Sequence, residues 1–91
     1  MIYLYVRQNV QDYQAWRAGF DNHAEARRAA GSTDDLFVMR NVDAPNEVTV
    51  IMGWSSADQA RAFTQSDTLK EAMKNAGVMG PPEVRFLEAI S

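Results

Sequence analysis

Hydrophobic and polar side chains alternate along the first residues of the chain. The alternation runs through Met1–Gln8, a segment rich in β-branched and aromatic residues. Period-two alternation of such residues predicts a β-strand. Both sets of alternating side chains are largely apolar, which indicates that this strand is covered on both faces.

The pattern then changes to steps of three and four residues between Val10 and Ala30, which predicts one long amphipathic helix. Asn9 is the first candidate for its N-cap and Asp12 the second, and Gly31 suits its C-terminal end. A glycine inside a helix costs up to ~1 kcal/mol relative to alanine. One interpretation of Gly19 is that another segment packs closely there. The inner face of this helix carries Tyr13, Trp16, Phe20, His23 or Ala24, and Arg27.

Two further strands follow the first helix. Ser32–Asp35 is a polar turn and Leu36–Val42 reads as the second strand. Asp43–Asn46 is a turn signal because proline and asparagine both favour chain reversal. Glu47–Trp54 alternates again and is the third strand. The short connection predicts that these two strands form a hairpin.

A second helical segment begins at Ser56, which forms a capping-box pattern with Gln59. Gln65–Asp67 interrupts this segment, since its serine and aspartate can cap a new start. Gly77 ends it. After Pro81 and Pro82, which exclude a helix, Glu83–Ala89 is the fourth predicted strand.

The predicted order is therefore β-α-β-β-α-β within one domain, residues 1–91. Right-handed crossovers place both helical segments on one face of a four-stranded antiparallel sheet. The predicted fold class is α+β, of the ferredoxin-like type.

The helices of such a fold cover only one face of the sheet, yet both faces of these strands are apolar. One set comprises Tyr3, Tyr5, Phe37, Met39, Ile51 and Leu87; the other comprises Ile2, Leu4, Leu36, Val38, Val50, Met52 and Phe86. Alternation does not tell which set meets the helices. Either uncovered set is a large exposed apolar patch, and a homodimer packed sheet on sheet would cover it.

Composition and charge exclude some classes of binding partner. The net charge is −3 and no basic stripe is present, so nucleic acid is not an expected partner. The third strand also lacks the basic and aromatic run of RNA-recognition motifs. No apolar run reaches membrane-spanning length, and Ile2–Val6 is too short for a signal peptide. A cytoplasmic protein without a membrane partner is expected.

Candidate chemistry gathers on the first helix. His23 is the only histidine, and its ordinary pKa suits general acid-base catalysis near neutral pH; the alternative is a structural histidine. Tyr13 could donate its hydroxyl to a ligand or pack against the sheet. Trp16, Phe20 and Trp54 could wall a ligand site, or belong to the core.

Arg27 could pair with an anionic ligand or extend its head to solvent. The chain has no cysteine, one histidine and scattered carboxylates without ligand spacing. Neither a metal site nor a bound cofactor is predicted.

The chain resembles the dimeric α/β-barrel superfamily, and within it the antibiotic-biosynthesis-monooxygenase-like and cyclase-like small proteins. The residues that carry the resemblance are Val10-x-Asp12-Tyr13-x-x-Trp16 with Phe20-Asp21, Glu47-Val48-Thr49-Val50 leading to Trp54-x-Ser56, Phe63 with Ser66 and Leu69-Lys70, and Ala76-Gly77-Val78-x-Gly80-Pro81-Pro82-Glu83-Val84. The resemblance implies a dimer with a ligand cleft between the sheet and the helices of each subunit. It also implies activities such as cofactor-independent oxygenation of polyketide quinols, or isomerisation of lactones.

Three interpretations remain open at this point, the third being that the protein's own side chains fill the cleft and the fold serves only assembly. In the first, a homodimer binds a small aromatic or polyketide-like molecule and acts as a cofactor-independent monooxygenase or cyclase. His23 is then the base, Tyr13 the hydrogen-bond donor, and Trp16, Phe20, Arg27 and Trp54 contact the ligand. In the second, the protein is a ligand-binding or stress-responsive dimer without enzymatic activity.

Overall fold

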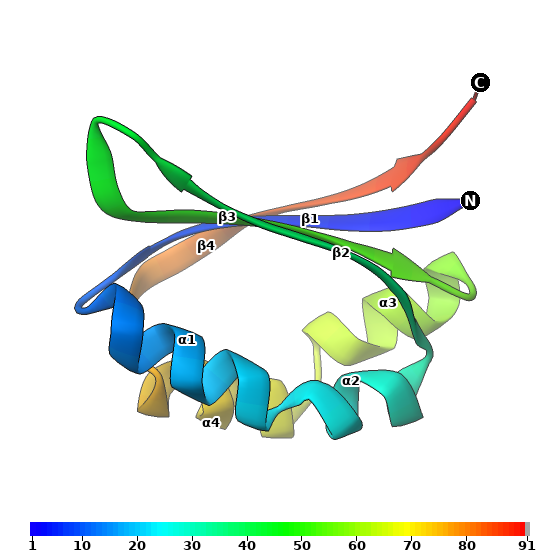
Figure 1. Ribbon diagram of the computed structural model, residues 1–91. Helices are drawn as coiled ribbons and strands as arrows, with labels where there is room; N and C mark the ends of the chain where they lie inside the picture. The colour runs from blue at the N-terminus through cyan, green and yellow to red at the C-terminus, as the bar shows by residue number, and fades with distance from the viewer. Residues whose placement is uncertain (91) are drawn as a thin grey trace.

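A computed structural model describes residues 1–90 and shows a four-stranded sheet with four short helices (Figure 1). The elements in order are β1 (Ile2–Val10), α1 (Tyr13–Asn22), α2 (Ala24–Ala30), β2 (Ser32–Asn41), β3 (Ala44–Trp54), α3 (Ala57–Thr64), α4 (Asp67–Asn75) and β4 (Val78–Glu88). This is the predicted β-α-β-β-α-β order, with each helical segment divided in two. The α+β, ferredoxin-like fold class is confirmed.

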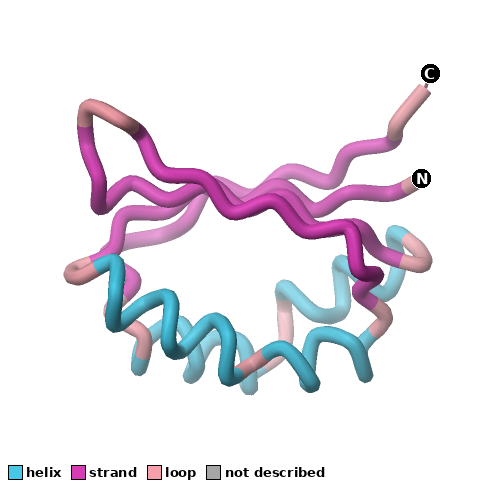
Figure 2. Tube along the Cα trace, viewed as in Figure 1, coloured by secondary structure: helices cyan, strands magenta, loops and turns pink. Residues whose placement is uncertain are grey.

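The sheet is antiparallel, with the strand order β2-β3-β1-β4. Figure 2 shows all four helices on one side of the sheet and none on the other. β1 lies between β3 and β4, and Leu4 is paired with Met52 on one side and Phe86 on the other. The two halves of the chain are thereby joined through one central strand.

The structure decides which set of alternating side chains meets the helices. Leu4, Val50 and Met52 belong to the buried core beneath the helices. The opposite set lies on the bare face, where Phe37, Met39 and Leu87 are 56%, 46% and 44% exposed. The predicted apolar patch is therefore present on this chain, and we call it the outer face.

The prediction of one helix from Val10 to Ala30 is wrong in two respects. The helix is broken at His23, whose φ of −93° and ψ of 6° lie outside the helical region and whose N–H bonds to the carbonyl of Phe20 at 3.2 Å. The change to an i−3 hydrogen bond tightens the turn and starts a new helix. Val10 belongs to β1, which ends two residues later than predicted.

Asp12, the second of the two candidate caps, begins the first helix. Its carboxylate accepts a hydrogen bond from the N–H of Gln14 at 3.1 Å. Asn9 is paired in β1 with Glu47 and Met79 and caps nothing. The predicted C-terminal end at Gly31 is confirmed, with a φ of 121°.

The second helical segment follows its predicted signals. Ser56 accepts from the N–H of Gln59 at 3.1 Å and caps α3. Ser66 accepts from the N–H of Leu69 at 3.2 Å and caps α4, so the predicted interruption is confirmed. Gly77 ends the segment with a φ of 82°.

The segment Ser32–Asp35, predicted as a turn, is the first part of β2. Its pairing with β3 is irregular between Ser32 and Leu36. The irregularity brings the hydroxyl of Thr33 against Gly53, where a Cβ would clash with it. The absence of a side chain at Gly53 therefore allows this polar segment to lie close against β3.

The fourth strand begins at Val78, five residues before the predicted start, and runs through Pro81 and Pro82. Proline is tolerated in a sheet at an edge strand or at a bulge. β4 lies at the edge of the sheet and contains a bulge. Its register with β1 shifts between Arg7 and Asn9, which leaves Gln8 without a partner in β4. Gly80 has a φ of 70° at this bulge.

The structure confirms the interpretation of Gly19 drawn from the sequence, which was that another segment packs closely there. A Cβ built on it would lie 3.1 Å from the Cβ of Ala76, just after α4. The absence of that atom lets α1 and the end of α4 approach closely. Both residues line the cavity described next.

Candidate functional site

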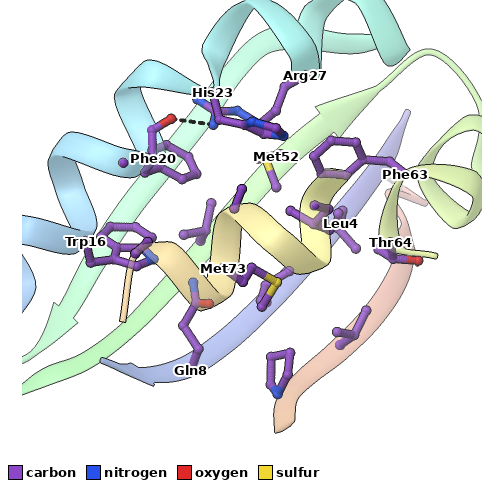
Figure 3. Close-up of a pocket in the computed structure, with 18 residues that line it drawn as sticks. Leu4, Gln8, Trp16, Phe20, His23, Arg27, Met52, Phe63, Thr64 and Met73 are labelled. Atoms are coloured by element: carbon purple, nitrogen blue, oxygen red, sulfur yellow. Dashed lines mark hydrogen bonds between the residues drawn. The ribbon is translucent and has the colours of Figure 1, made fainter. Parts of the chain in front are cut away.

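A cavity of about 100 Å³ lies between the inner face of the sheet and the helices, partly open to solvent (Figure 3). Most of its walls are aliphatic or aromatic. The lining residues are Leu4, Val6, Gln8, Trp16, Gly19, Phe20, His23, Arg27, Val50, Met52, Phe63, Thr64, Leu69, Ala72, Met73, Ala76, Pro82 and Val84. An apolar cavity with a few polar groups is the usual form of a small-molecule site.

Two aromatic rings on α1 form one wall. Trp16 and Phe20 are one helical turn apart, and their ring centroids are 5.0 Å apart at an interplanar angle of 23°. Trp16 is buried within the core, and Phe20 packs against it. Both rings line the cavity and make this wall aromatic.

His23 lines the cavity from the junction of α1 and α2. Its Nε2 is buried and has no hydrogen-bond partner within residues 1–90. Burial lowers the pKa of this imidazole, and the nearby charge of Arg27 lowers the pKa further. The side chain is therefore neutral at pH 7, with a free nitrogen beside an apolar cavity.

Arg27 lines the same cavity from α2 and is 6% exposed, so it does not extend its head to solvent. Its Nη1 donates to the carbonyl of Phe20 at 2.6 Å, as Figure 3 shows. Its guanidinium carbon lies 3.7 Å from the centroid of the Phe20 ring. Burial lowers the pKa of this guanidinium, yet arginine remains charged in proteins.

Gln8 is a site residue that the sequence analysis missed. It is 8% exposed, and its Oε1 is buried without a partner in the described part of the chain. The signal was available, because Gln8 shares the alternation of Leu4 and Val6 and so had to lie on the same face of β1. Figure 3 shows Gln8 across the cavity from His23 and Arg27.

The structure brings together four of the six predicted site residues, namely Trp16, Phe20, His23 and Arg27. Tyr13 and Trp54 do not line the cavity.

Tyr13 is the first residue of α1, and the guanidinium carbon of Arg40 lies 4.0 Å from its ring centroid. Trp54 is 1% exposed and packs at 5.0 Å against Phe63, whose own side chain lines the cavity. Packing against neighbouring side chains thus holds both rings away from the cavity.

Within residues 1–90, no group of three or more histidine, aspartate or glutamate side chains is placed to hold a metal ion. Over the same residues, no helix combines the length and the apolar character needed to cross a membrane.

Solved structures provide the comparison with known proteins. One chain is named "Putative antibiotic biosynthesis monooxygenase" from Bordetella bronchiseptica. It matches with a TM-score of 0.80 and 22% identity, over 99% of this chain and 97% of that one. SnoaB, named a cofactor-independent oxygenase from Streptomyces nogalater, matches with a TM-score of 0.78 and 16% identity, over 99% and 93% of the two chains.

The chain has the fold of these monooxygenase-like proteins. The resemblance inferred from the sequence is confirmed at the level of fold, over nearly the whole chain. No family model matches the sequence, and no curated protein matches it. Because one fold hosts many activities, the function has to be argued from the cavity.

Proposed function

We propose that this protein binds a small, flat, largely apolar molecule in the cavity and removes a proton from it with His23. The observation that carries the proposal is a neutral imidazole with an unpartnered, buried Nε2 beside stacked aromatic walls. The likeness in fold to SnoaB, named a cofactor-independent oxygenase, favours the same class of reaction here. Tyr13 and Trp54 lie outside the cavity and have no part in this proposal.

Proton removal is the step that oxygenation, cyclisation and isomerisation of such molecules share. His23 takes a proton from a phenolic hydroxyl or an acidic C–H group, which leaves an electron-rich anion. In the oxygenase case this anion passes electrons to O₂; one oxygen atom stays on the product and the other leaves as water. Gln8 accepts a hydrogen bond from a ligand hydroxyl and orients the ring.

The volume of the cavity limits the ligand. Ligand sites usually measure about 300–1,000 Å³, whereas this cavity measures about 100 Å³. An engineered cavity of about 150 Å³ binds benzene. The cavity therefore suits one ring, and a polycyclic ligand requires movement of Met73, a flexible side chain of α4.

The test is O₂ consumption with one- to three-ring dihydroxyarenes as substrates. We expect His23→Gln to lower turnover about 100-fold or more, since positioned acid-base groups contribute about 10²–10⁴-fold. Asn22→Gln changes the exposed neighbouring residue and should retain turnover. Wild-type turnover that survives in His23→Gln would refute the proposed role of the imidazole.

Non-catalytic binding is the second candidate function, and one feature favours it. Among the described residues, His23 and Arg27 are the only ionisable side chains that line the cavity, so no separate proton donor stands opposite the base. In this case the protein binds its ligand without turnover, as a stress-responsive binding protein would. A ligand that raises the thermal midpoint without O₂ uptake or product formation identifies this function.

We further propose that a second copy of the chain covers the outer face. Its centre is apolar, with Phe37, Ile51 and Tyr5 paired across three neighbouring strands. At one end Arg7 forms ion pairs with Glu47 at 3.2 Å and with Glu83 at 3.1 Å. An apolar centre with a polar border is the anatomy of a protein interface, and a two-fold dimer would place one apolar centre on the other.

A further inference from the structure

Three arginines lie on α1 and α2, and only one of them is buried. Arg17 pairs with Asp21 at 3.1 Å, and Arg28 pairs with Asp34 at 3.3 Å. Both of these pairs are on the surface. Arg27 is 6% exposed and, within residues 1–90, has no carboxylate within ion-pair distance.

The cavity supplies no negative charge either, because no aspartate or glutamate of the described chain lines it. The carboxylate that most favours the charge of Arg27 is Asp21, and Asp21 is already engaged by Arg17. One of the five N–H donors of Arg27 bonds to a protein carbonyl. A buried charge without a counter-ion is costly for a protein.

Phe20 holds this guanidinium in place without neutralising it. Its ring lies under the guanidinium carbon at 3.7 Å, and its carbonyl accepts from Nη1 at 2.6 Å. A guanidinium fixed in this way keeps its remaining donors in a planar fork, which matches the two oxygens of a carboxylate.

We infer that the ligand of this cavity is an aromatic carboxylate whose anionic oxygens pair with Arg27 while its ring lies in the apolar part of the cavity, beside Trp16. This inference rests on the proposed binding function and specifies the class of ligand. The anion supplies the counter-charge that the protein itself lacks. In an enzymatic reaction the same guanidinium would also stabilise negative charge formed when His23 removes a proton.

Benzoate and benzamide test the inference because they have nearly the same shape and differ in charge. Both are titrated into the wild-type protein, with binding followed by NMR at the amides of Gly19 and Phe20 and at the Trp16 indole. We expect benzoate to bind about tenfold more tightly or better, as charge-assisted hydrogen bonds predict. Equal affinity for the two probes overturns the inference while leaving the binding site intact.

Arg27→Met and Arg28→Met form a matched pair, since each removes one positive charge from α2. We expect Arg27→Met to abolish the preference for benzoate, so that benzoate binds no more tightly than benzamide. Arg28→Met should retain the preference because Arg28 is exposed. A preference that persists in Arg27→Met, or disappears equally in both variants, overturns the inference.

Arg27→Met should fold, because the carbonyl of Phe20 still accepts from the N–H of His23 at 3.2 Å. We expect its thermal midpoint to equal or exceed that of the wild type, whereas a purely structural arginine would lower it. If the variant does not fold, the comparison of the two probes on the wild-type protein decides the inference. Absence of binding by both probes contradicts the proposed binding function, and the inference with it.

Discussion

His23 and Arg27 are one helical turn apart, and the carbonyl of His23 accepts the N–H of Arg27 at 3.1 Å in the first turn of α2. This spacing places both side chains on the same face of the helix, where both line the cavity. The arginine charge adds to burial in lowering the pKa of His23. Burial first, and the charge of Arg27 second, thus keep His23 neutral and available as a base.

The lowered pKa of His23 predicts a dependence of stability on pH. The ordinary pKa of about 6.5 applies to the unfolded chain, which therefore binds more protons than the folded chain between the folded pKa and 6.5. The contribution of His23 to the free energy of unfolding is fully present above pH 6.5. It is lost as the pH falls through the pKa that His23 has in the folded chain. Burial, which disfavours the charged imidazole, is the main cause of the lowered pKa of His23.

We expect the free energy of unfolding of the wild type, relative to His23→Gln, to fall as the pH is lowered from 7.5 to 5. Urea denaturation of both proteins across this range measures the difference, in which the contributions of the carboxylates cancel. The chain contains no other histidine. A difference that is constant with pH, or that grows as the pH falls, contradicts the lowered pKa.

At the scale of the elements, the break at His23 and the bulge in β4 shape the site. The break ends α1 and starts α2, and both residues of the candidate chemistry, His23 and Arg27, lie at or just after it. The bulge leaves Gln8 without a partner in β4, and Pro82 lines the cavity beside it. The helix break at His23 and the bulge in β4 thus lie at the cavity, and its other walls are regular helix and strand.

The capping of α1 gives a prediction at this scale. Asp12→Ala should lower the free energy of unfolding by about 1 kcal/mol, because the N–H of Gln14 loses its acceptor. Asn9→Ala is the matched control and should change stability little, since Asn9 is exposed and caps no helix. Thermal or urea unfolding of the two variants decides between the two caps, and a larger loss in Asn9→Ala would reverse the assignment.

At the scale of the whole molecule, the sheet has one covered face and one bare face. The helices shelter the inner side chains and the cavity, while the outer face leaves large apolar side chains exposed. A 91-residue chain buries a smaller fraction of its surface than a larger domain does. Burial of the outer face against a second copy would therefore add stability that this chain needs.

Charge placed on the outer face tests the dimer. Analytical ultracentrifugation should show a dimer for the wild type and a monomer for Phe37→Glu, because the charge would be buried in the interface. Val42→Glu is the matched control: Val42 is 92% exposed and lies in the turn between β2 and β3. A monomeric wild type at micromolar concentration, or a dimer that persists in Phe37→Glu, contradicts the proposal.

The sequence by itself determined the order of the elements, because apolar periodicity and capping residues are local properties of the chain. Ser56, Ser66, Gly31 and Gly77 act within one turn of their own positions, and all four end or begin helices as predicted. Periodicity also placed Trp16, Phe20, His23 or Ala24, and Arg27 on one face of the predicted helix.

Only the tertiary structure decided the boundaries and the site, because these depend on contacts between distant segments. Alternation is identical for both faces of a sheet, so the covered face was settled by where the helices pack. The first part of β2 and the prolines of β4 are strand because a neighbour pairs with them. Tyr13 and Trp54 have the residue types of a ligand site, yet Arg40 and Phe63 engage them outside the cavity.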